Sequence, residues 1–143
     1  MRKCILCVLA VTVVTVALTM FGCTPSSEAV EKTYSDAGYT VEIGDLSEIS
    51  LPANAALRQL LSNAEGEVRY AFYAQKTDVL GVSSFAAGIC FVSEDLAKKA
   101  ESDWLAFLGD NASATVSVKG NLAVIGTADA VRLIDDYKDG LLG

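Results

Sequence analysis

Residues 67–76 read EVRYAFYAQK, and this stretch decides the fold. Its side chains alternate with the period of two that is typical of a β-strand. The alternation separates two faces, one with Val68, Tyr70, Phe72 and Ala74 and the other with Arg69, Ala71, Tyr73 and Gln75. Because each face carries an aromatic side chain, we expect the second face to be partly covered by other parts of the chain.

The chain after this strand predicts a second strand and then a helix. Residues 82–92, VSSFAAGICFV, are apolar enough for a more buried strand, and Gly88 indicates a bulge or a closely approaching backbone. Ser93 is placed to cap a helix over residues 94–108, whose first turn is acidic. The side of this helix expected to face the core carries Ala97, Ala100, Trp104, Phe107 and Leu108.

The C-terminal part repeats this order of elements. Residues 114–126 predict a hairpin with Gly120 and Asn121 at its turn, because short alternating segments lie on both sides of that pair. A last helix is predicted over residues 127–137. The tail beyond it carries no clear pattern.

Upstream of the first strand, residues 33–43 predict a hairpin and residues 52–62 a helix that begins at Pro52. The order of elements is then ββα three times over, without residue identity between the units. Such an order predicts an α+β fold in which an antiparallel sheet carries helices packed on one face. We expect residues 33–143 to form this single domain.

The first 23 residues, MRKCILCVLAVTVVTVALTMFGC, have the layout of an export signal. A short basic start precedes an uncharged apolar run, and the run ends at Gly22 and Cys23. This stretch resembles the signal peptides of bacterial lipoproteins, whose cleavage box ends in a small residue and a cysteine. Gly22 and Cys23 match that box, and Met20 stands at its usual aliphatic position.

The resemblance implies a signal peptide over residues 1–22, a lipid on Cys23 and a tether over residues 23–32 that lifts the domain off the bilayer. The protein is then expected outside the cytoplasm, anchored to a bacterial membrane. Two alternatives stay open. The apolar run is close to the lower length for a retained transmembrane anchor, and the protein could also be secreted without a lipid.

Composition excludes several kinds of chemistry. Without Arg2 and Lys3, nine basic residues remain against 18 acidic ones, a net charge of −9, so we predict no nucleic-acid partner. The chain has no histidine, which removes histidine-based catalysis and histidine-ligated zinc. Beyond Cys23 only Cys90 remains, so a disulfide framework is excluded, and we expect Cys90 to be a buried, inert thiol.

Two motifs only partly match known sites. Residues 81–85, GVSSF, lack the second glycine of a nucleophile elbow, so Ser83 and Ser84 are expected to be ordinary strand residues. Residues 135–140, DDYKDG, resemble the start of a calcium loop but have Tyr137 at a ligand position. We predict no metal site, no cofactor and no enzymatic activity.

The predicted function is that of a small lipid-anchored binding or interaction module. Its contact surface is expected at Arg69, Tyr73 and Gln75, because a tyrosine on the second sheet face can bind a partner. The tyrosines at 34, 39, 70 and 73 can also be core residues, and this interpretation is preferred. Two other functions stay open: a structural subunit of an envelope assembly, with an envelope protein as partner, and an enzyme that works without histidine.

Overall fold

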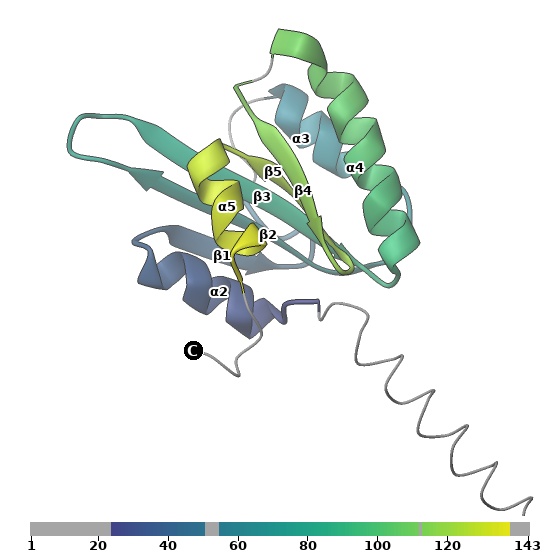
Figure 1. Cartoon of the computed structure of the whole chain (residues 1–143). Coiled ribbons are helices and arrows are strands. Elements are labelled where there is room, and N and C mark those ends of the chain that lie inside the picture. Colours follow the sequence, from purple (N-terminus) through teal and green to yellow (C-terminus); the bar gives the residue numbers. More distant parts are fainter. Residues whose placement is uncertain (1–23, 51–54, 112, 138–143) are drawn as a thin grey trace, which may run out of the picture.

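A computed structural model of the chain describes residues 24–50, 55–111 and 113–137 (Figure 1). The leader, with the predicted signal peptide and Cys23, and the predicted helix start at Pro52 lie outside the described residues. Five strands form one sheet in the order β1-β2-β3-β5-β4, and every neighbouring pair is antiparallel. Their bounds are β1 Thr40–Gly44, β2 Val68–Thr77, β3 Ser83–Phe91, β4 Thr115–Lys119 and β5 Leu122–Gly126. The predicted α+β class with an antiparallel sheet is confirmed.

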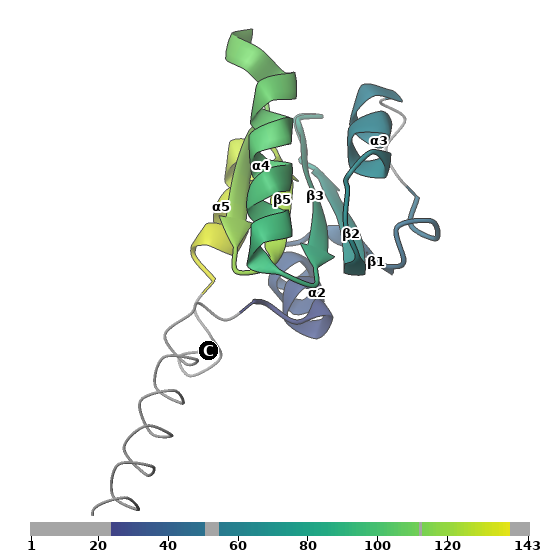
Figure 2. The ribbon, with the colours of Figure 1, turned by 90° about the vertical axis from the view of Figure 1, so that its right-hand side faces the viewer.

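Helices cover both faces of this sheet (Figures 1 and 2). Helices α2 (Ser27–Asp36) and α5 (Ala128–Asp135) pack on one face, and α3 (Ala55–Ser62) and α4 (Glu94–Leu108) pack on the other. The prediction that all helices lie on one face is therefore wrong. The reason is that β2, β3 and β5 carry apolar side chains on both sides, and each side must be shielded from water.

The ββα order occurs twice, ending in α4 and α5, while the first unit is α2-β1-α3. The hairpin predicted for residues 33–43 is wrong, since only β1 is a strand there. Ser26 instead caps α2, and its side chain accepts a hydrogen bond from the Ala29 N–H at 3.2 Å. Val30 and Tyr34, spaced by four, are both fully buried, so burial of these two side chains in the core stabilises the helix.

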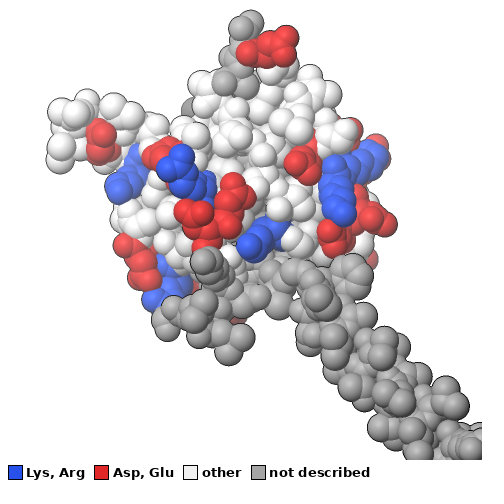
Figure 3. All heavy atoms as spheres, in the orientation of Figure 1, with Lys and Arg blue, Asp and Glu red and all other residues white. Residues whose placement is uncertain are grey.

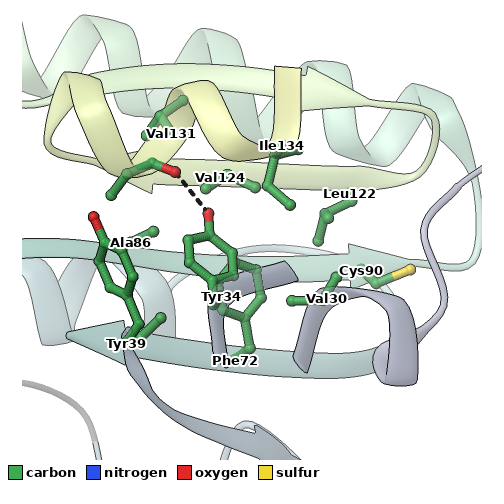
Figure 4. Packing of buried hydrophobic residues seen from close by; sticks show 12 residues of the cluster. Val30, Tyr34, Tyr39, Phe72, Ala86, Cys90, Leu122, Val124, Val131 and Ile134 are labelled. Carbon is green, nitrogen blue, oxygen red and sulfur yellow. Dashed lines mark hydrogen bonds between the residues drawn. The ribbon is translucent and has the colours of Figure 1, made fainter. Parts of the chain in front are cut away.

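The α2–α5 core lies between these two helices and the sheet (Figure 4). Its largest buried members are Tyr34, Phe72, Leu122, Ile134, Val30, Val124 and Val131. The Tyr34 and Phe72 rings lie 5.3 Å apart, and the Tyr34 hydroxyl donates a 3.0 Å hydrogen bond to the backbone carbonyl of Ala130 on α5. Tyr34 therefore joins α2, the sheet and α5 while its polar atom keeps a partner.

The α3–α4 core lies on the opposite face and includes Trp104, Phe91, Leu61, Ile89 and Ile125. The helix predicted over residues 94–108 is confirmed, with Ser93 as its N-cap. Phe107 departs from its predicted core position and is 56% exposed, whereas its neighbour Leu108 packs against the α3–α4 core, so in the last turn of α4 the side chain of Leu108 faces the core in place of Phe107.

Gly88 serves neither as a bulge nor as a point of backbone contact. The irregularity lies on β2, between Val68 and Tyr70, and it carries Val68 to the α3–α4 side instead of the predicted one. At Gly88 a Cβ atom would lie 2.3 Å from the Phe72 ring, so the missing side chain makes room for that ring.

Candidate functional site

The turn between β2 and β3, residues 78–82, projects beyond the rest of the sheet (Figure 1). Its three aliphatic side chains point into solvent: Val79 is fully exposed, Leu80 is 85% exposed and Val82 is 60% exposed. In the space-filling view the projection is mostly white, which marks uncharged residues, and the sequence gives Asp78 as the charged residue of this turn (Figure 3). We call residues 78–82 the hairpin tip. Adjacent exposed aliphatic side chains of this kind are typical of an interaction surface.

Hydrogen bonds hold the hairpin tip in one shape. The Asp78 carboxylate accepts from the N–H groups of Leu80 and Val82, at 2.8 and 2.9 Å. The Asp78 N–H donates to the Val82 carbonyl, and Gly81 provides the positive φ of +81° that closes the turn. Because the backbone is already ordered, a partner would meet a preorganised loop with a small entropic cost of binding.

The opposite end of β2 holds the start of the described chain. The Tyr70 hydroxyl donates a 2.6 Å hydrogen bond to the carbonyl of Pro25, which is buried. The Asn121 N–H donates to the Thr24 side chain at 2.9 Å. The tether predicted over residues 23–32 is therefore wrong from Thr24 onward, because these bonds fix residues 24 and 25 to the sheet and α2 begins at Ser27. The signal for this attachment lay in Tyr70, a tyrosine whose hydroxyl needs a partner when its ring is covered.

The predicted contact residues Arg69, Tyr73 and Gln75 do not form one compact surface. Arg69 and Gln75 are exposed, but they are separated by about 20 Å along the strand. Tyr73 lies between them, half-buried against the α3–α4 core, and its hydroxyl is 3.4 Å from the Gln75 side-chain oxygen. The aromatic side chains Tyr34 and Tyr39 are core, while Tyr70 and Tyr73 are half-buried.

Ser84 contributes to a polar link between β3 and α5. Its hydroxyl donates a 2.6 Å hydrogen bond to Asp129, and the Thr127 side chain accepts from the Phe85 N–H at 3.1 Å. Hydrogen bonding from Ser84 lowers the pKa of the Asp129 carboxyl. The arrangement joins two elements and leaves Ser84 without a base that could activate it, since a carboxylate with a low pKa is a weak one.

Removal of this link should change the pH dependence of stability. Ser84→Ala is expected to lower the free energy of unfolding by about 1 kcal/mol at neutral pH, a value discounted for the exposure of Asp129. Because the folded-state pKa of Asp129 is depressed, this stabilisation is present above the ordinary aspartate pKa and is lost as pH falls through the folded-state pKa.

Urea unfolding at neutral and acidic pH measures this effect. The difference in the free energy of unfolding between wild type and Ser84→Ala should become smaller as the pH is lowered. Ser83→Ala is the matched control, because Ser83 is exposed and its hydroxyl lies 3.3 Å from the Thr77 hydroxyl, away from Asp129. A difference for Ser84→Ala that stays constant with pH would contradict the assigned role of Asp129.

Cys90 is buried, as the sequence predicts, and burial raises the pKa of its thiol. A thiol of this kind is a poor nucleophile at neutral pH. At the partial calcium motif, Asp135 accepts a hydrogen bond from Ser117 on β4. Among the described residues, no group of three or more acidic or cysteine side chains is placed to hold a metal ion.

None of the helices in the described ranges has the length and apolar character needed to cross a bilayer. Comparison with known protein families, curated proteins and solved structures finds no match to the chain. The sequence pattern predicts no contact at the hairpin tip and places Val82 in the second strand, whereas β3 begins at Ser83. The signal that marks the hairpin tip is the pair Val79 and Leu80, two large aliphatic residues inside a turn bounded by Asp78 and Gly81.

Proposed function

We propose that this protein is a lipid-anchored interaction module, held outside the cytoplasm on a bacterial membrane, that binds another protein through the hairpin tip. The observation that carries the proposal is the rigid tip with its exposed Val79, Leu80 and Val82. Exposed aliphatic side chains cost free energy in water, and a hydrophobic pocket on a partner would remove that cost.

The positions of the two ends of β2 support this proposal. A lipid on Cys23 would be attached one residue before Thr24, which is bonded to the sheet through Asn121. The hairpin tip follows the other end of β2, about 26 Å away along the strand from Tyr70. A bilayer at Cys23 would therefore lie at the end of the domain away from the tip, so the tip would face proteins of the envelope and not the anchoring membrane (Figure 1).

The anchor is tested by intact mass of the full-length protein purified from membranes in mild detergent. We expect a mass equal to residues 23–143 plus a diacylglyceryl group, and loss of both the added mass and membrane retention in Cys23→Ala. A mass equal to the uncleaved chain would make the leader a transmembrane helix and would overturn the lipid anchor.

The tip is tested by a photo-crosslinking amino acid placed at position 80 in living cells. We expect a crosslink to one envelope protein, reduced at least about tenfold by the charge introduced in Val79→Asp. Because the wild-type side chains at positions 79 and 80 lie in solvent, neither change should affect folding.

Position 107 is the matched control, because Phe107 is another large exposed apolar residue but lies in the last turn of α4. A crosslink at position 107 to the same protein, with none at position 80, would contradict the proposed contact. Arg69→Ala with Gln75→Ala tests the contact surface predicted from sequence. If this double variant lost the crosslinked partner while Val79→Asp kept it, the contact surface would lie on the body of β2 and not at the hairpin tip.

A further inference from the structure

Strand β1 lies at one edge of the sheet, paired with β2 on one side. In an antiparallel pair, alternate residues direct their N–H and C=O groups away from the partner strand. Among the described residues, no backbone group hydrogen-bonds to β1 from its outer side. With respect to the described residues, this edge therefore has backbone donors and acceptors that another extended chain could pair with.

A groove of about 510 Å³ runs along this edge, between α2 and the loop that follows β1. Its apolar lining consists of Val41 and Ile43 on β1 and Ile49 on the loop. A strand laid against β1 could place alternate side chains on these residues. The volume lies within the range of sites that bind small ligands and short segments.

Three carboxylates surround the same groove: Glu31 on α2, Glu42 on β1 and Glu48 on the loop. The Glu42 carboxylate accepts a 2.6 Å hydrogen bond from the Ser50 N–H, which fixes the loop beside the strand. Among the described residues that line the groove, none is a lysine or arginine. An occupant with positive charge opposite these glutamates, and apolar side chains between the basic ones, would complement this lining.

We propose that the groove along β1 is a docking site for an extended basic segment of another protein, which adds to the sheet as a further antiparallel or parallel strand. Backbone hydrogen bonds to the free edge would supply affinity, and the alternation of apolar and basic side chains would supply specificity. A second copy of this chain is disfavoured as the occupant, because it would bring two sets of glutamates opposite each other across the new strand pair. This site is separate from the hairpin tip and does not depend on it.

The probe is a fluorescein-labelled decapeptide of alternating valine and lysine, titrated into the full-length protein in nonionic micelles. Fluorescence anisotropy measures its affinity, and amide exchange followed by NMR locates it. We expect saturable binding that weakens with added salt, together with exchange slowed about tenfold at alternate residues of β1. The same peptide with alternate backbone nitrogens methylated should not bind, because it cannot pair with the edge.

Glu31→Gln with Glu48→Gln should weaken binding about fivefold, since two charge pairs are lost. Glu67→Gln with Glu101→Gln is the matched control, because it removes the same charge from two residues that do not line the groove. Equal weakening by both pairs would show attraction to net charge alone and would overturn the site. Unchanged exchange in β1, or equal binding of the methylated peptide, would overturn strand addition.

Discussion

Gly126→Ala is expected to lower the free energy of unfolding by about 3 kcal/mol, a large share of the roughly 5–15 kcal/mol by which domains are ordinarily stable. A Cβ atom at Gly126 would lie 2.1 Å from the carbonyl oxygen of Phe85 and 2.8 Å from the Cα of Ala86. Both are backbone atoms of β3, the strand that pairs with β5 at this position. They cannot move aside as a side chain could, so β3 and β5 would have to separate.

The matched control for this prediction is Gly44→Ala, at the end of the edge strand β1. There the nearest atom to an added Cβ is a Glu48 carboxylate oxygen at 3.5 Å, which is an ordinary contact. The free energy of unfolding of Gly44→Ala should therefore stay within about 0.5 kcal/mol of that of the wild type. Chemical denaturation of both variants is the measurement. Similar stability in the two would mean that β3 and β5 are less closely apposed at Gly126 than the structure shows.

Trp104→Ala is expected to lower the free energy of unfolding by about 3–5 kcal/mol, because it removes the largest side chain of the α3–α4 core. Trp104 is fully buried on α4 and, with Leu60 and Ala64 of the facing α3 region, lines a small cavity of about 140 Å³. The substitution would enlarge a space that is already incompletely filled. The contacts that hold α3 against α4 and the sheet would be reduced at the same time.

Thermal or denaturant unfolding measures this loss, and Leu105→Ala is the control on the same helix. Leu105 follows Trp104 directly but is 50% exposed, so its truncation should change stability by less than about 1 kcal/mol. A loss for Trp104→Ala no larger than that for Leu105→Ala would contradict the placement of α4 on the sheet.

The strands and helices from residue 68 onward could be predicted from local pattern. Strand β2 alternates between its two faces from Tyr70 onward, and α4 has both a capping serine and an apolar stripe, so local and long-range preferences agree there. The hairpin of β4 and β5 follows from its Gly120–Asn121 turn. The buried Cys90 follows from its apolar strand.

Helix α2 could not be predicted in the same way, because its sequence, SEAVEKTYSD, is mostly polar and short. Only Val30 and Tyr34 reach the core, and two apolar residues spaced by four are a weak signal of a helix. The coverage of the predicted contact residues Arg69, Tyr73 and Gln75 is also hard to read from the sequence. Alternation along β2 identifies two faces and its aromatic residues predict partial coverage of the second, but the pattern does not reveal that Tyr73 packs against the α3–α4 core while Arg69 and Gln75 stay exposed.

The amino-acid sequence by itself therefore determined the α+β class, the antiparallel strands, the helix of residues 94–108 and the exclusion of histidine chemistry, because these depend on local periodicity and composition. The tertiary structure alone decided that helices cover both sheet faces, that residues 24 and 25 are bonded to the rest of the fold, that the hairpin tip projects from the sheet and that β1 is an edge strand. These features depend on which distant segments meet, as Tyr70 meets Pro25 and Phe72 meets Gly88. Contacts between residues far apart in sequence arise from packing of the whole chain, and no local pattern specifies them.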